Sequence, residues 1–193
     1  MANASTTGFG FRPIKKIAQN YNNAALSEYS VAASSALISH ACLVQLTADG
    51  VVLASGNTTT NNLGTLNGVF YTDATSNKPT FSNFSPASNT ATDIVAFIND
   101  DPMQMYEIMS ADTAFNQNEV GHCADQVLAV GTTPLFISKS KISATTATTM
   151  AQMFIMGVSR DPDHSDTTAE GFALRVQIRE HILVGNDTAR AGI

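Results

Sequence analysis

The chain has 193 residues and a formal net charge of −6, and only 13% of its residues are charged, against roughly 25% in ordinary domains. No segment approaches the roughly 20 consecutive apolar residues of a membrane span, so we expect no membrane partner. An acidic chain is not expected to bind nucleic acid, which is a polyanion. The first ten residues lack the charged-then-apolar order of a signal peptide, which predicts synthesis in a cytosol with Cys42 and Cys123 reduced.

Charge is unevenly distributed along the chain. Residues 1–27 carry three basic residues and no acid, so the remainder has a net charge of −9. This part is rich in Gly and Asn and has little periodicity, which predicts an extended N-terminal arm with one turn of helix at Ile14–Gln19. We expect a single β-domain over 28–185 and a C-terminal tail over 186–193.

Short apolar segments between polar turns follow the arm, and each predicts a strand. In chain order they are Glu28–Ala32, Ala41–Thr47, Val51–Ala54, Leu66–Tyr71, Thr80–Phe84, Asp93–Ile98, Met103–Ile108, Gln126–Val130, Leu135–Ser143, Met150–Ser159 and Phe172–Arg179. Asp49-Gly50 predicts a tight hairpin between two of them. A helix over Ala24–Ile38 is an alternative to the first strand, and Ala111–His122 has room for a short helix.

The number and spacing of these strands predict an all-β fold, an antiparallel β-barrel or sandwich with an extended N-terminal arm. Asp93–Ile98 is apolar on both faces, which is typical of a central strand covered on both sides. In Phe172–Arg179, large apolar residues alternate with polar ones, which is typical of a half-buried antiparallel strand.

Four residues could be considered for a zinc site, namely His40, Cys42, His122 and Cys123. His40 and Cys42 would share one face of a strand, but adjacent His122 and Cys123 would point to opposite faces. Neither pair has the spacing of a zinc motif. We therefore expect no metal and no other cofactor, and we expect Cys42 to be a small buried residue.

Two acidic segments could also be considered for chemistry. The segment 161–166 begins like a calcium loop, but Asp166 stands where the motif requires Gly and Phe172 where it requires Glu. A solvated turn is the preferred interpretation, with an irregular cation site as the alternative. Asp100-Asp101-Pro102 is a turn signal, because adjacent carboxylates diverge whereas acid–base catalysis needs two that face one another. No nucleophile or phosphate-loop motif is present, so the chain is not expected to be an enzyme.

Several short motifs occur in a definite order along most of the chain. They are Gly8-Phe9-Gly10-Phe11-Arg12-Pro13, Gly68-Val69-Phe70-Tyr71-Thr72-Asp73, Pro86-Ala87-Ser88 and Asp100-Asp101-Pro102 followed by Glu107-Ile108. Their order resembles a family of structural proteins of tailed bacteriophages that decorate or cement the capsid exterior. The chain differs from that family at Ser39-His40-Ala41, at Asn99 and at Tyr106, where the family often has Gly-Asp-Pro, Ala and Phe.

The resemblance implies a virion protein that is made in the host cytoplasm, binds the major capsid protein on the outside of the shell and forms a homo-oligomer, a dimer or trimer. A cement protein stabilises the assembled shell because its binding energy is available only from that state. We expect the arm to act as a latch on the capsid, with the contacts made by Phe9, Phe11, Arg12, Ile14, Lys15 and Lys16.

Other function classes remain open. A head-fibre or tail-associated adhesin with a β-sandwich could bind a host glycan, and Phe9, Phe11, Tyr71, Phe81 and Phe84 could then form a stacking platform, although such platforms usually use Trp. A shell-forming capsid protein is disfavoured by the short chain and the lack of a long helical pattern, and an enzyme is disfavoured by the missing motifs.

Overall fold

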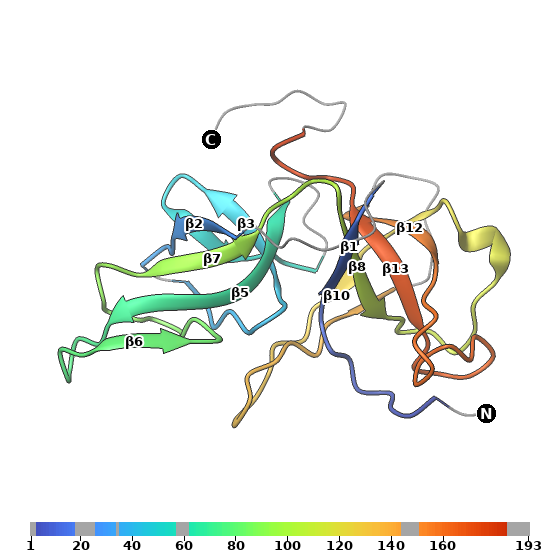
Figure 1. Ribbon diagram of the computed structural model, residues 1–193, viewed down its shortest axis with the longest axis horizontal. Coiled ribbons are helices and arrows are strands. Elements are labelled where there is room, and N and C mark those ends of the chain that lie inside the picture. The colour runs from blue at the N-terminus through green and yellow to red at the C-terminus, as the bar shows by residue number, and fades with distance from the viewer. Residues whose placement is uncertain (1–2, 18–25, 34, 57–61, 144–150, 185–193) are drawn as a thin grey trace.

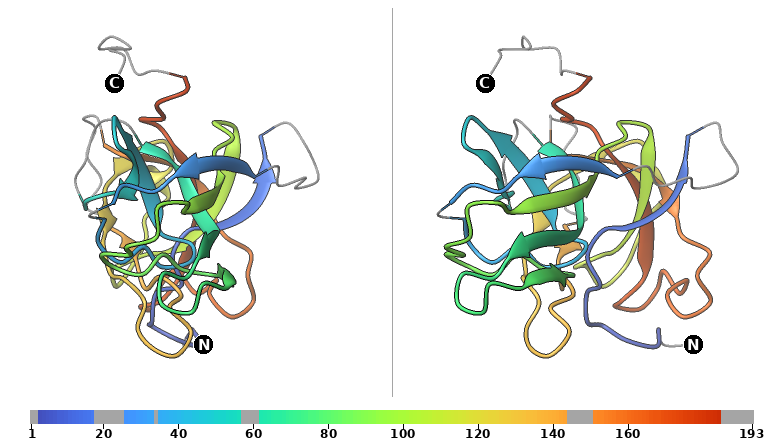
Figure 2. Two further views of the ribbon diagram at one scale, coloured as in Figure 1. Left: turned by 90° about the vertical axis from the view of Figure 1, so that its left-hand side faces the viewer. Right: turned by 60° about the vertical axis from the view of Figure 1, so that its left-hand side comes forward.

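The computed structural model describes residues 3–17, 26–33, 35–56, 62–143 and 151–184 (Figure 1). Their regular structure is almost entirely β-strand, with one short 3-10 helix, η1 (Gln117–Glu119). All pairs of named strands are antiparallel, which confirms the predicted all-β antiparallel fold. Two main sheets lie next to each other (Figures 1 and 2), and we call them sheet A and sheet B.

Sheet A contains the N-terminal strand and the last strand of the chain. Its spatial order is β1 (Arg12–Lys16), β8 (Gln104–Met109), β13 (Ala173–Ile178), β12 (Met153–Val158) and β9 (Cys123–Ala124). A minor two-stranded sheet pairs β10 (Gln126–Val127) with β11 (Lys141–Ile142).

Sheet B contains most of the chain between residues 27 and 99. Its spatial order is β2 (Ser27–Ser30), β7 (Val95–Asn99), β5 (Asn62–Thr72), β3 (Leu43–Thr47) and β4 (Gly50–Leu53), and β6 (Pro79–Ser82) pairs with β5. Pairing of Thr47 with Gly50 puts Ala48 and Asp49 in the hairpin loop, one position before the predicted turn. Residues 100–103 connect β7 of sheet B to β8 of sheet A.

Each sheet buries its own group of apolar side chains. One core lies under sheet A and includes Tyr106, Phe172 and Val176, and the other lies under sheet B and includes Leu63 and Ile98. Leu43 and Ala54, which belong to or follow strands of sheet B, pack in the core of sheet A. These side chains hold the two sheets together, because apolar surface buried between them is removed from water.

The burial of the central strands differs in part from the prediction. β7 lies between β2 and β5, as expected of a central strand. Its outward residues Val95 and Phe97 are nevertheless only half-buried, so this strand is not covered equally on both faces. All six residues of β8, which lies between β1 and β13, are buried.

The N-terminal segment differs most from the prediction, which was an extended arm with a helical turn at Ile14–Gln19. Residues 12–16 form strand β1 and not a turn of helix, and β1 pairs with β8. The side chain of Phe11 is wholly buried in the core of sheet A. A Cβ on Gly10 would lie 2.6 Å from the Ala41 carbonyl oxygen, so only Gly allows this close approach. The first residues are therefore part of the fold, not an arm with little to bury.

Other predicted elements are placed as follows. The described residues of the segment 24–38 contain β2 and no helix, so the predicted strand is confirmed there and the alternative helix is not. The short helix expected within Ala111–His122 is η1. Leu135–Ser143 forms a strand only at β11, and its first half is loop, because the Phe136 N–H donates to the Thr132 carbonyl oxygen and closes a turn there. The predicted tail over 186–193 lies outside the described residues.

Candidate functional site: the outer faces of the two sheets

One row of charged residues crosses the outer face of sheet A. The strand register aligns Arg12 of β1 with Glu107 of β8, Glu107 with Arg175 of β13, and Arg175 with Gly157 of β12. Residues paired in this way lie on the same face of a sheet. Two arginines therefore flank a single carboxylate, and the fourth position of the row has no side chain.

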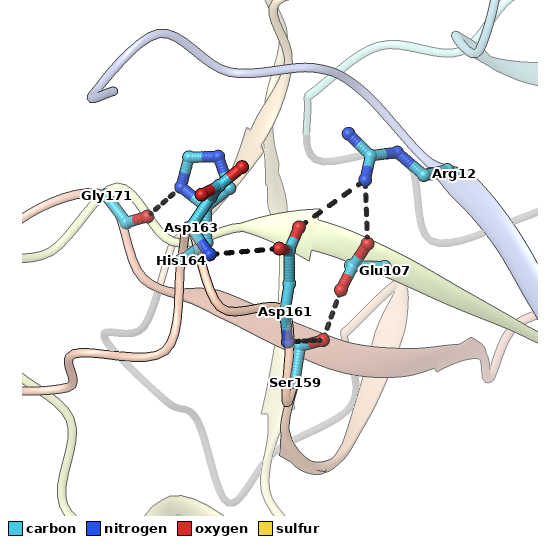
Figure 3. A network of polar contacts seen from close by, with 7 residues as sticks. All are labelled: Arg12, Glu107, Ser159, Asp161, Asp163, His164 and Gly171. Atoms are coloured by element: carbon cyan, nitrogen blue, oxygen red, sulfur yellow. Dashed lines mark hydrogen bonds and ion pairs between the residues drawn. The ribbon is translucent and has the colours of Figure 1, made fainter. Parts of the chain in front are cut away.

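Glu107 is buried, with 5% of its surface exposed, and both of its carboxylate oxygens have partners (Figure 3). Arg12 Nη1 lies 3.1 Å from Glu107 Oε2, and the Ser159 hydroxyl donates a hydrogen bond to Oε1. Arg12 Nη1 also lies 3.6 Å from Asp161 Oδ2. A buried carboxylate is stable only when it is paired and hydrogen-bonded, and here both conditions are met.

The loop from Ser159 to Gly171 is held by its own polar groups (Figure 3) and by Asn3, whose side-chain amide donates to the carbonyl oxygens of Asp166, Ala169 and Glu170. The backbone N–H of Asp163 donates to Asp161 Oδ1 at 3.1 Å, and the N–H of His164 donates to the Asp161 carbonyl oxygen at 3.0 Å. The buried His164 ring has its Nδ1 2.8 Å from the Gly171 carbonyl oxygen. These contacts confirm the turn predicted at 161–166, and the described residues contain no cluster of side chains that could hold a metal ion.

A groove of about 540 Å³ lies beside this network. Its walls come from β12, from β13, from the loop that follows β12 and from the segment around η1. The lining residues are Gln117, Val120, Met156, Gly157, Val158, Ser159, Arg160, Ser165 and Arg175. Two of them are basic and none is acidic, which is unusual in a chain with a net charge of −6.

The residues predicted as a capsid latch are mostly engaged within the protein itself. Phe11 is in the core, Arg12 pairs with Glu107, and Lys16 forms a salt bridge with Asp101. Ile14 and Lys15 are half-buried in β1.

Phe9 completes the set of six predicted latch residues. Its ring packs on His164, with the ring centroids 5.6 Å apart, and the Arg12 guanidinium lies 4.2 Å from the centre of the same ring. Of the six predicted residues, Phe9 and Arg12 contact each other, and Phe9, Phe11, Arg12 and Lys16 have partners elsewhere on the same chain.

Asp101 forms a salt bridge with Lys16, the last residue of β1. Burial alone would raise the pKa of its carboxyl, but hydrogen bonds from Lys16 and from the Met103 N–H outweigh burial and hold that pKa below its usual value of 3.8. Asp100 accepts hydrogen bonds from the Ser27 hydroxyl at 2.9 Å and the Tyr29 hydroxyl at 2.7 Å. The two adjacent carboxylates therefore bind different elements at the connection between the sheets, as expected of a turn and not of a catalytic pair.

The residues considered for zinc do not converge. Cys42 is buried in the core of sheet B, and burial raises the pKa of its thiol. Cys123 lies in β9 of sheet A, and His40 Nδ1 lies 2.9 Å from the Asn67 carbonyl oxygen. Both cysteines are free thiols.

The outer face of sheet B carries three aromatic rings, the exposed Phe81 and the half-buried Phe70 and Phe97, which we call the aromatic face. Phe70 and Phe81 are directly paired across β5 and β6, and their ring centroids are 4.7 Å apart. Phe81 also stacks on Phe97, with an interplanar angle of 16°. Phe81 is 76% exposed, the largest exposure among the large hydrophobic residues of the described chain.

Sequence reasoning identified only part of these surfaces. Phe81 was considered for stacking, but Tyr71 is buried in the core of sheet B, and Phe70 and Phe97 were missed. The available signal was the two-residue alternation in β5 and β7, which puts Phe70 and Phe97 opposite the buried Val69 and Ile98. The position of Arg175 on the polar face of β13 follows from the same alternation.

Comparison of the chain with models of protein families, with curated proteins and with solved structures finds no match in any of the three. The described residues contain no helix long and apolar enough to cross a membrane.

Proposed function

We propose that this chain is a structural protein of a bacteriophage virion that binds the outside of the capsid shell through the aromatic face of sheet B. The order of the short motifs, which resembles that of the decoration family, supports the phage assignment. The exposure of Phe81, at 76%, is the observation that supports this particular surface. Phe81 is in ring contact with Phe70 and Phe97, and contiguous exposed apolar patches on soluble proteins often mark a binding site.

The aromatic face coincides with one of the motifs. Phe70 belongs to the segment Gly68-Val69-Phe70-Tyr71-Thr72-Asp73, whose first five residues are the end of β5. Within it, Val69 and Tyr71 point into the core and Phe70 points outward, so the segment serves both the fold and the exposed surface. Pro86-Ala87-Ser88 lies in the loop between β6 and β7, and both of these strands pair with β5 in sheet B.

Attachment would stabilise the shell by burial of apolar surface. Each large side chain that is fully buried contributes about 1.5–3 kcal/mol, so three rings provide moderate affinity at one site. A dimer or trimer that bridges neighbouring capsid subunits gains further affinity from effective concentration. Since the bound state exists only on the assembled shell, occupancy stabilises assembly.

The aromatic face also favours a second candidate function, a fibre or tail adhesin that binds a host glycan. Aromatic rings stack on sugars, and the exposed carboxylate of Glu28 lies in register with Phe97 at the edge of the same face. Binding of oligosaccharides to the isolated protein, together with no binding to capsid shells, would favour this candidate over the first.

A co-sedimentation assay with purified undecorated shells tests the capsid proposal. We expect the full chain to sediment with shells and Phe81→Ser to bind much more weakly while it keeps its fold. Val127→Ser is the matched control, since Val127 is 46% exposed and lies in β10, outside sheet B. Equal binding by Phe81→Ser and Val127→Ser would overturn the assignment of this face, and no binding by the full chain would overturn the capsid function.

A further inference from the structure

We infer that the groove on the outer face of sheet A binds a carboxylate-bearing, acidic segment of a partner protein. This surface is separate from the aromatic face, and the inference does not depend on the identity of the partner. Three observations support the inference. Arg175 has no carboxylate partner among the described residues, Gly157 leaves space beside it, and the groove lining contains no acidic residue.

Arg175 has no carboxylate partner among the described residues. Its neighbour in the row, Glu107, already uses one oxygen for Arg12 and the other for Ser159. Arg175 Nε is buried and has no hydrogen-bond partner within the described chain. An unpaired buried donor costs about 1–3 kcal/mol. A ligand carboxylate would remove that cost only if it accepts from Nε, as the paired geometry through Nε and one Nη allows.

Gly157 lies opposite Arg175 on β12, and its backbone has φ +150°. A Cβ at this position would lie 3.2 Å from Arg175 Nη2, so any side chain would press on the guanidinium. The absence of that side chain leaves room beside Arg175 within the groove, whose volume is about 540 Å³. This volume is in the range of sites that hold several atoms of a ligand.

The second arginine is placed to bind the same ligand. Arg160 is exposed at the edge of the groove and has no salt bridge within the described part of the chain. Asp161 faces Arg12, and Glu119 Oε1 accepts a hydrogen bond from the Asn116 amide at 3.2 Å, while Glu119 Oε2 is buried without a partner among the described residues. Neither acid forms a salt bridge with Arg160 or Arg175 within the described residues. Guanidinium groups bind carboxylates through two parallel hydrogen bonds, which makes a pair of arginines suited to an acidic segment.

The remaining lining favours a peptide over a nucleic acid. Val120, Met156 and Val158 provide apolar contacts next to the two arginines, as a polypeptide with mixed side chains requires. A nucleic acid would bring a row of phosphates against a body of net charge −6, and only two lining residues could neutralise them.

Fluorescence anisotropy with a labelled hexaglutamate peptide and the full chain tests the inference, with hexaglutamine as the uncharged counterpart. We expect binding of hexaglutamate at low ionic strength, and we expect Arg175→Gln and Arg160→Gln each to weaken it about ten-fold. Arg179→Gln is the matched control, since Arg179 is exposed beyond the end of β13 and outside the groove, and it should bind like the unmodified chain.

Several outcomes would overturn the inference. They are no hexaglutamate binding, equal binding of hexaglutamine, equal weakening by Arg179→Gln, and tighter binding of an oligothymidine than of hexaglutamate. Thermal melting of each variant separates lost binding from lost folding. Arg160→Gln keeps the test decisive if Arg175→Gln does not fold, because Arg160 is exposed.

Discussion

The ring of Phe11 meets the ring of Tyr106 edge-on inside the core of sheet A, with the ring centroids 6.1 Å apart and the planes at 90°. Phe11 directly precedes β1, and Tyr106 is in the middle of β8. This contact joins the start of the chain to its most buried strand. It makes the N-terminal segment a structural part of the domain.

Phe11→Ala should therefore destabilise the protein by about 3–5 kcal/mol, because a large ring is removed from a packed core. Phe9→Ala is the control, since the Phe9 ring is only half-buried and packs on His164. Phe9→Ala should lower the free energy of unfolding clearly less than Phe11→Ala does. Urea denaturation of the full chain followed by circular dichroism measures both values. A loss below about 1 kcal/mol for Phe11→Ala would mean that the segment is dispensable for folding.

Arg12→Ala should cost about 1–3 kcal/mol, because it leaves the buried Glu107 carboxylate without its cation. In the background of Glu107→Gln, the same change should cost much less, since no buried charge is then left unpaired. Lys15→Ala in the same strand is the control, as Lys15 forms no salt bridge within the described residues. Additive effects of the Arg12 and Glu107 changes would contradict the pairing.

The pair of Lys16 and Asp101 predicts a loss of stability in acid. The folded-state pKa of Asp101 lies below its ordinary value of 3.8, so its contribution is complete above that value and disappears as the pH falls through the folded-state pKa. Asp101→Asn should lower stability at neutral pH and make the stability less dependent on pH below 3.8. Denaturation of both proteins across this pH range provides the test, and parallel curves would contradict it.

The two thiols should be inert in the native protein. Cys42 is fully buried, burial raises the pKa of its thiol, and Cys123 is 8% exposed. A thiolate is the reactive form, so a disulfide reagent should modify neither residue until the chain is unfolded in urea. Protein purified without added metal should also contain no zinc. Stoichiometric zinc that is lost in Cys42→Ser and Cys123→Ser would contradict this account of the cysteines.

The sequence predicts the strands well because period-two alternation and turn residues are local signals. The alternation of Phe172 to Arg179 identified β13, and the Asp-rich turn at 161–166 was recognised from composition. The burial of Phe11 was not predictable, because its short segment has no periodicity and its partner Tyr106 is 95 residues away in the sequence.

The same limit applies to the candidate surfaces. Alternation puts Phe97 and Arg175 on one side of their strands, but it does not say which side another layer covers. The groove and the aromatic face arise from neighbours in space: Gly157 opposite Arg175, and Phe81 between Phe70 and Phe97. Strand register across a sheet is set by distant pairing and was not available from a single sequence.

The number of copies of this protein per virion tests the central claim most directly. Quantitative mass spectrometry of purified particles, from the phage whose genome encodes the chain, compares it with the major capsid protein. A capsid decoration protein should be present in amounts comparable to the major capsid protein. Copy numbers as low as those of tail or fibre proteins, or no copies at all, would contradict a role on the capsid shell.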